Sequence, residues 1–526
     1  MSGRVLALGH QARAGAVLLL VLVAWQLGAG WADTTVLPSP TAVIGRVRAD
    51  GLTAYLDPLG TTLVEAGLGF LFGTAAAVAL GVLAIRFRFL LPPVTQVATL
   101  TYTVPTFAVG AVLVTVMPTT AVRVTISALY VVFTTVVGVV SGMQNADRAS
   151  LDVVTAAGGG SWRQLWSVRL PAGLPSFFAA LQIGAPSALL GAVVAEYIGG
   201  SGGIGVAMLG AQRNSDVQRT WGLALAVTAA SLLAYGLVGL VGRLSTTWAT
   251  SAPGAVHLPS AAVPTLRRRL LTGAGQGLLV AVLAIGGWWL LLRLLDVNAF
   301  VARTPAQVWS YLTGAEAGAA RGQLLQLLGT TLGHMLLGLV AGVLLGVLVA
   351  SAFTLVPVVQ RVLLPIALLV QSVPIVAFLP LALLVFGRGA GVATLIAGLV
   401  AFFPTMVNVC AALRSTPAHA IDLLTSVGAG SVRCLVTARL PYAAPAIFAS
   451  IRIAAPAAFS GALLVEWLAL GNGLGGVMST AAATYGYDEL WSAVALGSVA
   501  SIAVAAIAKA CQRSVARRMS LAVPAL

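Results

Sequence analysis

The sequence predicts an all-α membrane protein with about twelve transmembrane helices, arranged as two parallel six-helix repeats. Of its 526 residues, 59% are hydrophobic and only 8% are charged, whereas a soluble domain carries about 25% charged residues. Apolar runs long enough to span a bilayer recur along the chain, and the second half of the sequence repeats the first. A surface so poor in charge would not stay dispersed in water, so a soluble enzyme is excluded.

The membrane crossings are expected wherever about 20 apolar residues follow one another, because that length spans a hydrocarbon core of about 30 Å. In the first half they lie near 14–31, 61–84, 89–116, 121–142, 173–198 and 220–242. In the second half they lie near 272–295, 330–354, 362–386, 389–411, 443–470 and 490–508. The first run follows Arg4 and Arg13, as the core of a signal peptide would, but it is long and no small-residue cleavage site follows it cleanly. We expect it to be retained as a helix.

The charge balance predicts the orientation of the chain in the membrane. The 29 Lys and Arg residues exceed the 14 Asp and Glu residues, which gives a net charge of +15. If the N-terminus is cytoplasmic, most basic residues fall in inner segments, where Lys and Arg are retained. The main groups are Arg86 with Arg88, the Arg267–Arg269 cluster and the Lys509–Arg518 tail. We expect a multi-pass protein of the inner or plasma membrane, with both termini cytoplasmic, that contacts anionic lipids and no nucleic acid.

The sequence predicts no directly bound cofactor and no catalytic residues. Its three cysteines and four histidines share no metal-ligand spacing. The single lysine, Lys509, has no glycine-rich loop before it, so the chain lacks a nucleotide-binding P-loop. Energy for any pumping must therefore come from a separate ATPase or from an ion gradient.

An internal repeat organises the chain. The segment from Leu151 aligns without a gap with the segment from Ile421. This alignment pairs Asp152 with Asp422, Gly158 with Gly428, Arg169 with Arg439, Pro171 with Pro441, Pro186 with Pro456 and Glu196 with Glu466. An even number of crossings per repeat gives both copies the same orientation. We expect a first unit at 1–243, a proline-containing cytoplasmic linker at 244–271 and a second unit at 272–526.

A loop of about 30 residues between the fourth and fifth crossings of each unit is long enough to be functional. Each loop is expected to hold a short amphipathic helix, a glycine break, a second short helix N-capped by Ser161 or Ser431, and a Leu-Pro stop. Arg169 and Arg439 would lie near the end of that second helix, where a cation is favourable. The candidate residues are Asp152, Ala156, Ala157, Gly158, Ser161, Arg169 and Pro171 in the first loop, and Asp422, Thr425, Gly428, Ser431, Arg439 and Pro441 in the second.

These loops resemble the EAA loop of the membrane subunits of bacterial ABC importers, with acidic and small residues, a glycine, about a dozen residues and then Leu-Pro. The segments Ser372–Gly389, Ala401–Asn408 and Val465–Met478 are similar to permeases of the nitrate, sulfonate and taurine type. The resemblance covers nearly all of both halves. It is looser in the first, where Val104–Arg123 lacks the phenylalanine-glycine turn of the family.

This resemblance implies the type I ABC importer permease fold, with two permease units fused in one chain. It implies that each loop forms a coupling helix that docks on one of two ABC ATPase subunits, which use ATP and Mg. It further implies an extracytoplasmic solute-binding protein or lipoprotein, and a small solute such as nitrate, a sulfonate or a heterocyclic vitamin precursor. Independently of the family, a short helix between a glycine and a proline can transmit a partner's movement. The alternative is an interfacial helix lying on lipid, but such a helix would carry more Lys and Arg.

Polar residues at membrane depth are candidate pathway residues, because burying them in lipid costs several kcal/mol. Glu196 and Glu466 end the fifth crossings of the two units. Arg452 lies within the fifth crossing of the second unit, at the position where the first unit has Gln182. Glu65 lies early in the second crossing of the first unit. The two repeat-matched glutamates either contact the solute or pack against the glycine-rich turn that follows them. Arg452 either faces an anionic solute or pairs with a backbone carbonyl.

The Gly338, Gly342 and Gly346 spacing indicates close helix packing.

The alternative to an ATP-driven permease is a secondary transporter with twelve crossings, driven by an ion gradient, in which the membrane glutamates bind protons.

Overall fold

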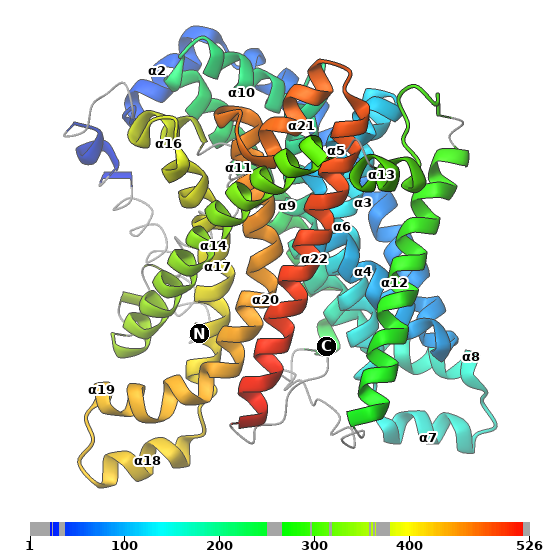
Figure 1. Ribbon diagram of the computed structural model, residues 1–526. Coiled ribbons are helices and arrows are strands. Elements are labelled where there is room, and N and C mark those ends of the chain that lie inside the picture. Colours follow the sequence, from blue (N-terminus) through cyan, green and yellow to red (C-terminus); the bar gives the residue numbers. More distant parts are fainter. Residues whose placement is uncertain are drawn as a thin grey trace.

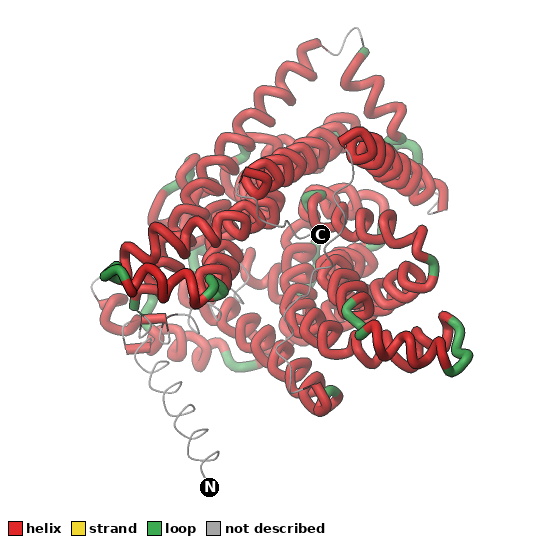
Figure 2. The backbone as a smooth tube through the Cα atoms, turned by 90° about the horizontal axis from the view of Figure 1, so that it is seen from below, coloured by secondary structure: helices red, strands yellow, loops and turns green. Residues whose placement is uncertain are grey.

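The computed structural model describes residues 22–23, 25–30, 37–249, 266–294, 297–314, 318–356, 359–360, 363 and 379–518. This part of the chain consists of helices joined by short connections and holds no strand (Figure 2). The all-α prediction is therefore confirmed.

Eight helices within the described residues are long and apolar enough to cross a membrane, or nine if a bent pair counts as one span. In the first half they are α3 (Thr53–Arg86), α6 (Thr119–Gln144), α9 (Leu170–Gly199) and α11 (Val217–Ser245). In the second half they are α14 (Gly318–Leu355), α17 (Ala390–Arg414), α20 (Leu440–Val465) and α22 (Tyr487–Arg518). The predicted crossing at 272–295 falls on α12 (Leu266–Leu294), whereas most of those at 14–31 and 362–386 lies outside the described residues. The number of twelve thus stays a prediction.

The run at 89–116 was expected as one crossing, but it folds as two helices. These are α4 (Leu91–Thr103) and α5 (Thr106–Val116), and the bend between them is 88°. Val104 is extended and Pro105 follows it. Because proline disfavours a helical residue before it and has no N–H, the chain turns at this point.

Small residues bring the crossings of each half together. A Cβ atom on Gly338 would lie 2.5 Å from the carbonyl oxygen of Thr394 on α17, and one on Gly342 would collide with the carbonyl oxygen of Gly398. In the first half, a Cβ atom on Gly73 would lie 2.7 Å from the Ala128 carbonyl oxygen on α6. The close packing predicted from the glycine spacing is therefore present between α14 and α17.

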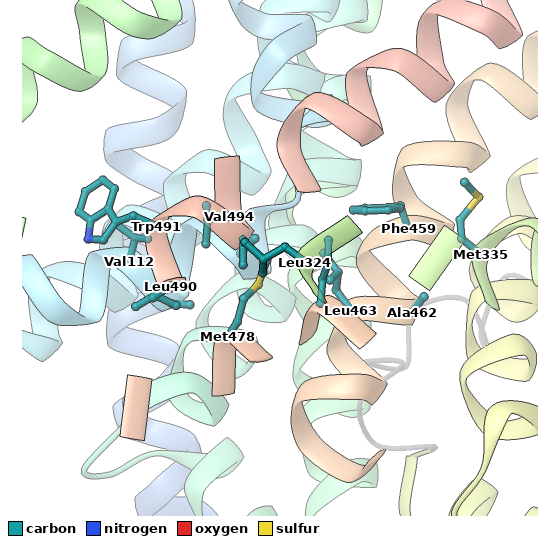
Figure 3. Close-up of a cluster of buried hydrophobic side chains, with 14 of the residues drawn as sticks. Val112, Leu324, Met335, Phe459, Ala462, Leu463, Met478, Leu490, Trp491 and Val494 are labelled. Carbon is teal, nitrogen blue, oxygen red and sulfur yellow. The ribbon is translucent and has the colours of Figure 1, made fainter. Parts of the chain in front are cut away.

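The bent pair α4–α5 joins the two halves. The Tyr102 hydroxyl donates to the Ile453 carbonyl oxygen at 2.8 Å, and the Ser501 hydroxyl donates to that of Thr103 at 2.6 Å. Val112 of α5 belongs to the same buried cluster as Leu463, Met478, Leu490 and Trp491 of the second half (Figure 3). The described part of the chain is thus one bundle.

Two loops project from the same side of this bundle. The first carries α7 (Arg148–Ala156) and α8 (Ser161–Gln164), and the second carries α18 (Ala418–Ser426) and α19 (Ser431–Cys434). Both lie at the lower edge of Figure 1, whereas α2 (Pro40–Asp50), α10 (Ile204–Arg213), α13 (Pro305–Thr313), α16 (Leu379–Phe386) and α21 (Gly473–Ala483) lie at the upper edge. We call these the loop side and the far side.

Two expectations about the loops were wrong. Ser161 and Ser431 are not N-caps, because Gly160 and Gly430 hold that position without a side-chain hydrogen bond. The Leu-Pro pair does not stop the helix either. Instead, π turns η2 (Leu165–Arg169) and η6 (Leu435–Arg439) carry the chain past the proline into α9 and α20.

The π turn explains how the helix passes the proline. The Leu170 N–H donates to the carbonyl oxygen of Leu165, five residues back, and this wider turn accommodates Pro171, which has no N–H, inside one helical span. Arg169 is consequently inside a continuous helix and not near its end; its guanidinium reaches the Met143 carbonyl oxygen at 3.3 Å. Arg439 reaches that of Leu413 at 3.4 Å in the same way.

Candidate functional site

A buried carboxyl group links three helices of the first half on the far side. Glu196 on α9 is 1% exposed. Its Oε1 accepts a hydrogen bond from the Thr62 hydroxyl on α3 at 2.6 Å, and its Oε2 accepts one from the Gly205 N–H at 2.5 Å. The Thr62 hydroxyl also accepts from the Ile204 N–H at 2.9 Å. Glu196 and Thr62 together therefore satisfy two free N–H groups at the start of α10.

The second half repeats this cluster. Glu466 begins η7 (Glu466–Leu470), is fully buried, and accepts from the Thr331 hydroxyl at 2.7 Å and from the Gly475 N–H at 3.1 Å. The Thr331 hydroxyl accepts from the Leu474 N–H at 2.9 Å. His334 Nδ1 lies 2.9 Å from the other carboxyl oxygen of Glu466. The repeat thus preserves a helix-pinning carboxyl group in each unit.

The charged residues beside the two clusters differ between the units. The sequence did not predict the contacts of Arg123 in the first unit or of His334 in the second. Glu65 forms an ion pair with Arg123 on α6 at 2.7 Å, and both side chains are buried. The same guanidinium donates to the Gly202 carbonyl oxygen at 3.2 Å. His334 holds the repeat position of Glu65, as the spacing from Thr62 and Thr331 shows. The repeat alignment could have identified His334 as the counterpart of Glu65, but we considered the histidines only as possible metal ligands.

Both glutamates face protein and not open space. Each carboxyl group accepts a hydrogen bond from the start of the helix that follows it. This arrangement fits the expectation that the glutamates pack against the glycine-rich turn and not the expectation that they contact the solute. A cavity also lies on this side of the bundle, between the two halves. Neither glutamate lines this cavity, whereas the residue that follows each glutamate, Tyr197 or Trp467, does.

Gln182 and Arg452 lie closer to the loops along α9 and α20 than the glutamates do, and both are partly buried. Gln182 packs on α11, where a Cβ atom on Gly239 would collide with its amide. Arg452 has electrostatic interactions with Arg513 and Lys509 of α22. Lys509 is the repeat equivalent of Gly239, so the second half carries a cationic group where the first half has close packing. Neither Gln182 nor Arg452 lines the cavity.

A cavity of about 870 Å³ lies on the far side, between the two halves. Its lining from the first half includes Tyr197, Gln212 and Arg213, and that from the second includes Arg388 and Trp467. The Gln212 amide donates to the Tyr197 hydroxyl at 2.9 Å. Within the described residues, no hydrogen bond or ion pair engages the guanidinium of Arg213 or Arg388. Asp216 also lines the cavity, but its carboxylate is paired with Arg46 at 2.5 Å. The cavity is large enough for a small molecule, and the charged groups that it offers without a partner are cationic.

The two loops present matching apolar surfaces to solvent. Val153 and its repeat equivalent Leu423 are 68% and 69% exposed. Gly158 and Gly428 have φ values of 74° and 78°, which favour glycine, so the predicted glycine breaks are present. Further exposed apolar residues on the loops are Trp162, Trp166, Val427, Val432 and Val436.

The other predicted loop residues surround this surface. Asp152, Ala156, Ala157, Asp422, Thr425 and both serines are exposed. Asp147 caps α7 by accepting from the Ser150 N–H and hydroxyl, both at 3.1 Å, and these bonds lower the pKa of its carboxyl group. No group of three His, Cys, Asp or Glu side chains that could hold a metal ion occurs within the described ranges.

Comparison with known proteins agrees with this architecture. The chain is 34% identical over 164 residues to a probable ABC transporter permease protein of Haemophilus influenzae, an alignment of 31% of this chain and 67% of the relative. It is 31% identical over 232 residues to the taurine transport system permease protein TauC of Escherichia coli, covering 44% of this chain and 82% of the relative. The putative aliphatic sulfonates transport permease protein SsuC of Bacillus subtilis is 27% identical over 248 residues, covering 46% and 89%.

The family model matches the chain twice, once in each repeat. The matched residues are 69–247 and 342–521, which together make up more than half of the chain. The relatives are permeases of ABC transporters, which argues against the gradient-driven alternative. The chain is a multi-pass membrane protein and a transport permease that belongs to the family of binding-protein-dependent transport system inner membrane components, with two units of that family fused.

Proposed function

We propose that two ATP-binding subunits drive this permease by docking on the 148–171 and 418–441 loops from the cytoplasm. These subunits would bind ATP and Mg, while the permease binds neither. Both chain ends would then lie in the cytoplasm of a cell whose inner or plasma membrane holds the protein. The pair of exposed apolar loops on one side of the bundle is the observation that carries this proposal.

The continuous helices beyond each loop support a mechanical role. Residues Ser161–Gly199 form one apolar helical span, and Ser431–Leu470 form another. Because neither span breaks at its proline, a displacement of α8 or α19 passes directly along α9 or α20. The far ends of these spans carry Tyr197 and Trp467, which line the cavity. Movement at the loops would therefore open or close the cavity between the halves.

Lipid contact is the weaker alternative for the loop surfaces. A helix that lies on anionic lipid carries many Lys and Arg on its polar face. Here α7 has Arg148 alone and α18 has neither residue type. Exposed Val153 and Leu423 without basic flanks fit the apolar cleft of a protein partner better.

The solute would enter the far-side cavity from an extracytoplasmic binding protein or lipoprotein. Arg213 and Arg388 favour an anion there, and Tyr197 and Trp467 favour a flat or apolar portion. We therefore propose a small anion such as a sulfonate or nitrate as the solute; a heterocyclic vitamin precursor is the second class to test.

Substitution of the matched loop residues tests the proposed docking. In the purified complex, Val153→Asp and Leu423→Asp should each remove about one of two bound ATP-binding subunits, and the double variant should bind none. Leu52→Asp, at a 66% exposed position of the far side, is the control and should bind both. Two subunits retained by the double variant would refute the proposal. Uptake into vesicles that needs ATP and survives an uncoupler would test the energy source.

A further inference from the structure

A second cavity lies on the loop side, within the first half. It has a volume of about 390 Å³ and lies where the end of α3, the turn η1 (Arg88–Leu90) and the end of α6 meet the start of α7. Three arginines line it, Arg88, Arg148 and Arg169, together with Gln144. Small-molecule pockets range from about 300 to 1,000 Å³, so a headgroup-sized ligand fits.

The charge of this cavity is uncompensated. No acidic side chain lines it. Within the part of the chain that the structure describes, no hydrogen bond or ion pair engages the guanidinium group of Arg88 or Arg148, and that of Arg169 donates one N–H to the Met143 carbonyl oxygen. The nearest carboxylate in sequence, Asp147, is occupied by the Ser150 N–H and hydroxyl. Three positively charged residues that line one cavity favour an anion there, and guanidinium groups bind phosphate in particular.

The surroundings of the cavity favour a ligand that comes from the membrane. Leu83, Phe87 and Phe89, at the end of α3 and in the turn after it, are 44%, 41% and 74% exposed. The Arg86 guanidinium lies 5.0 Å from the centre of the Phe87 ring. Apolar and aromatic side chains beside arginines are typical of the membrane interface, where basic pockets bind lipid headgroups.

The second half does not repeat the arginine set. The repeat equivalent of Arg148 is Ala418, and that of Gln144 is Arg414. The Arg414 guanidinium is engaged by the Gln360 amide oxygen, and Arg439 donates to the Leu413 carbonyl oxygen. The arginine set is thus a sequence difference between two otherwise matched loops.

We propose that this arginine pocket binds the phosphate group of an anionic phospholipid at the base of the 148–171 loop. The lipid would bridge the ends of α3 and α6 to α7 and so fix the position of one loop and not the other. The shared chemistry is a phosphate ester or free phosphate. The adjoining apolar residues favour the lipid as its source.

Native mass spectrometry of the full chain in detergent with added phosphatidylglycerol tests this proposal. We expect wild-type protein to retain phosphatidylglycerol in preference to phosphatidylcholine. An arginine near a membrane surface is worth a factor of about five in binding, so Arg88→Gln with Arg148→Gln should weaken retention about 30-fold. Arg163→Gln, an exposed arginine of the same loop that does not line the pocket, is the matched control and should bind as wild type.

Three outcomes would overturn the proposal. One is equal retention of phosphatidylglycerol by the double variant and the wild type. Another is equal retention of phosphatidylcholine and phosphatidylglycerol by the wild type. The third is displacement of phosphatidylglycerol by inorganic phosphate at equal concentration, which would make free phosphate the ligand. Arg88→Lys with Arg148→Lys keeps the charge and should keep most of the binding, which separates loss of the pocket from loss of the fold.

Discussion

Removing the threonine hydroxyl of either buried carboxyl cluster should destabilise the protein strongly. In Thr331→Val the hydroxyl that donates to Glu466 at 2.7 Å and accepts from the Leu474 N–H at 2.9 Å is lost. A hydrogen bond contributes about 0.5–1.5 kcal/mol, and a buried donor left unsatisfied costs about 1–3 kcal/mol. The free energy of unfolding should therefore fall by about 2–4 kcal/mol. Thr62→Val removes the equivalent hydroxyl of the first half and should have a similar effect.

The adjacent threonines provide controls within the same helices. Thr61 and Thr330 make only long hydrogen bonds of 3.4 Å to the preceding turn of their own helix. Thr61→Val and Thr330→Val should thus change the free energy of unfolding by less than about 0.5 kcal/mol. Unfolding by a denaturing detergent, followed by tryptophan fluorescence, measures all four variants. A loss below about 1 kcal/mol for both Thr62→Val and Thr331→Val would show that the clusters do not pin α10 and α21.

Three other predictions concern packing, charge and pH. Gly342→Ala should lower the yield of folded protein in detergent, because the added Cβ atom would collide with the α17 backbone. Gly333→Ala on the same helix is the control and should not lower the yield, since no atom lies within 4 Å of its Cβ position. Equal yields from the two variants would contradict the close packing. Arg123→Ala leaves the Glu65 carboxylate buried without its partner and should cost about 3–5 kcal/mol, measured by the same detergent unfolding; a cost below about 1 kcal/mol would contradict it. The Asp147 carboxyl group should titrate below its usual pKa of 3.8 in a carbon-13 NMR experiment. Its cap on α7 should therefore be present at neutral pH and be lost as the pH falls through that lowered pKa. A titration midpoint above 3.8 would contradict the cap.

The repeat allowed much of this molecule to be predicted from the sequence. Pairing Glu196 with Glu466 and Gly158 with Gly428 placed equivalent residues in equivalent environments, because two copies of one fold share the burial and the backbone conformation of matched positions. Hydrophobic run length found the long helices, since the bilayer sets that length.

Features that depend on contacts between distant segments were not predictable in this way. Arg123 approaches Glu65 from another helix, and the far-side cavity combines Arg213 with Arg388 of the other half. The π turn before Pro171 is local and was missed for a different reason. A Leu-Pro pair usually ends a helix, whereas here a hydrogen bond that reaches five residues back carries the helix past the proline.

Site-directed cross-linking tests the central claim, that both loops dock an ATP-binding subunit, most directly. The exposed Cys511 would first be replaced by serine, which leaves the buried Cys410 and Cys434. Cysteine would then be placed at Val153, at Leu423 or, as a control, at Leu52, in the complex assembled with its ATP-binding subunits. We expect cross-links to those subunits from Val153→Cys and from Leu423→Cys, and none from Leu52→Cys. A transport-competent complex in which neither loop position cross-links would contradict it.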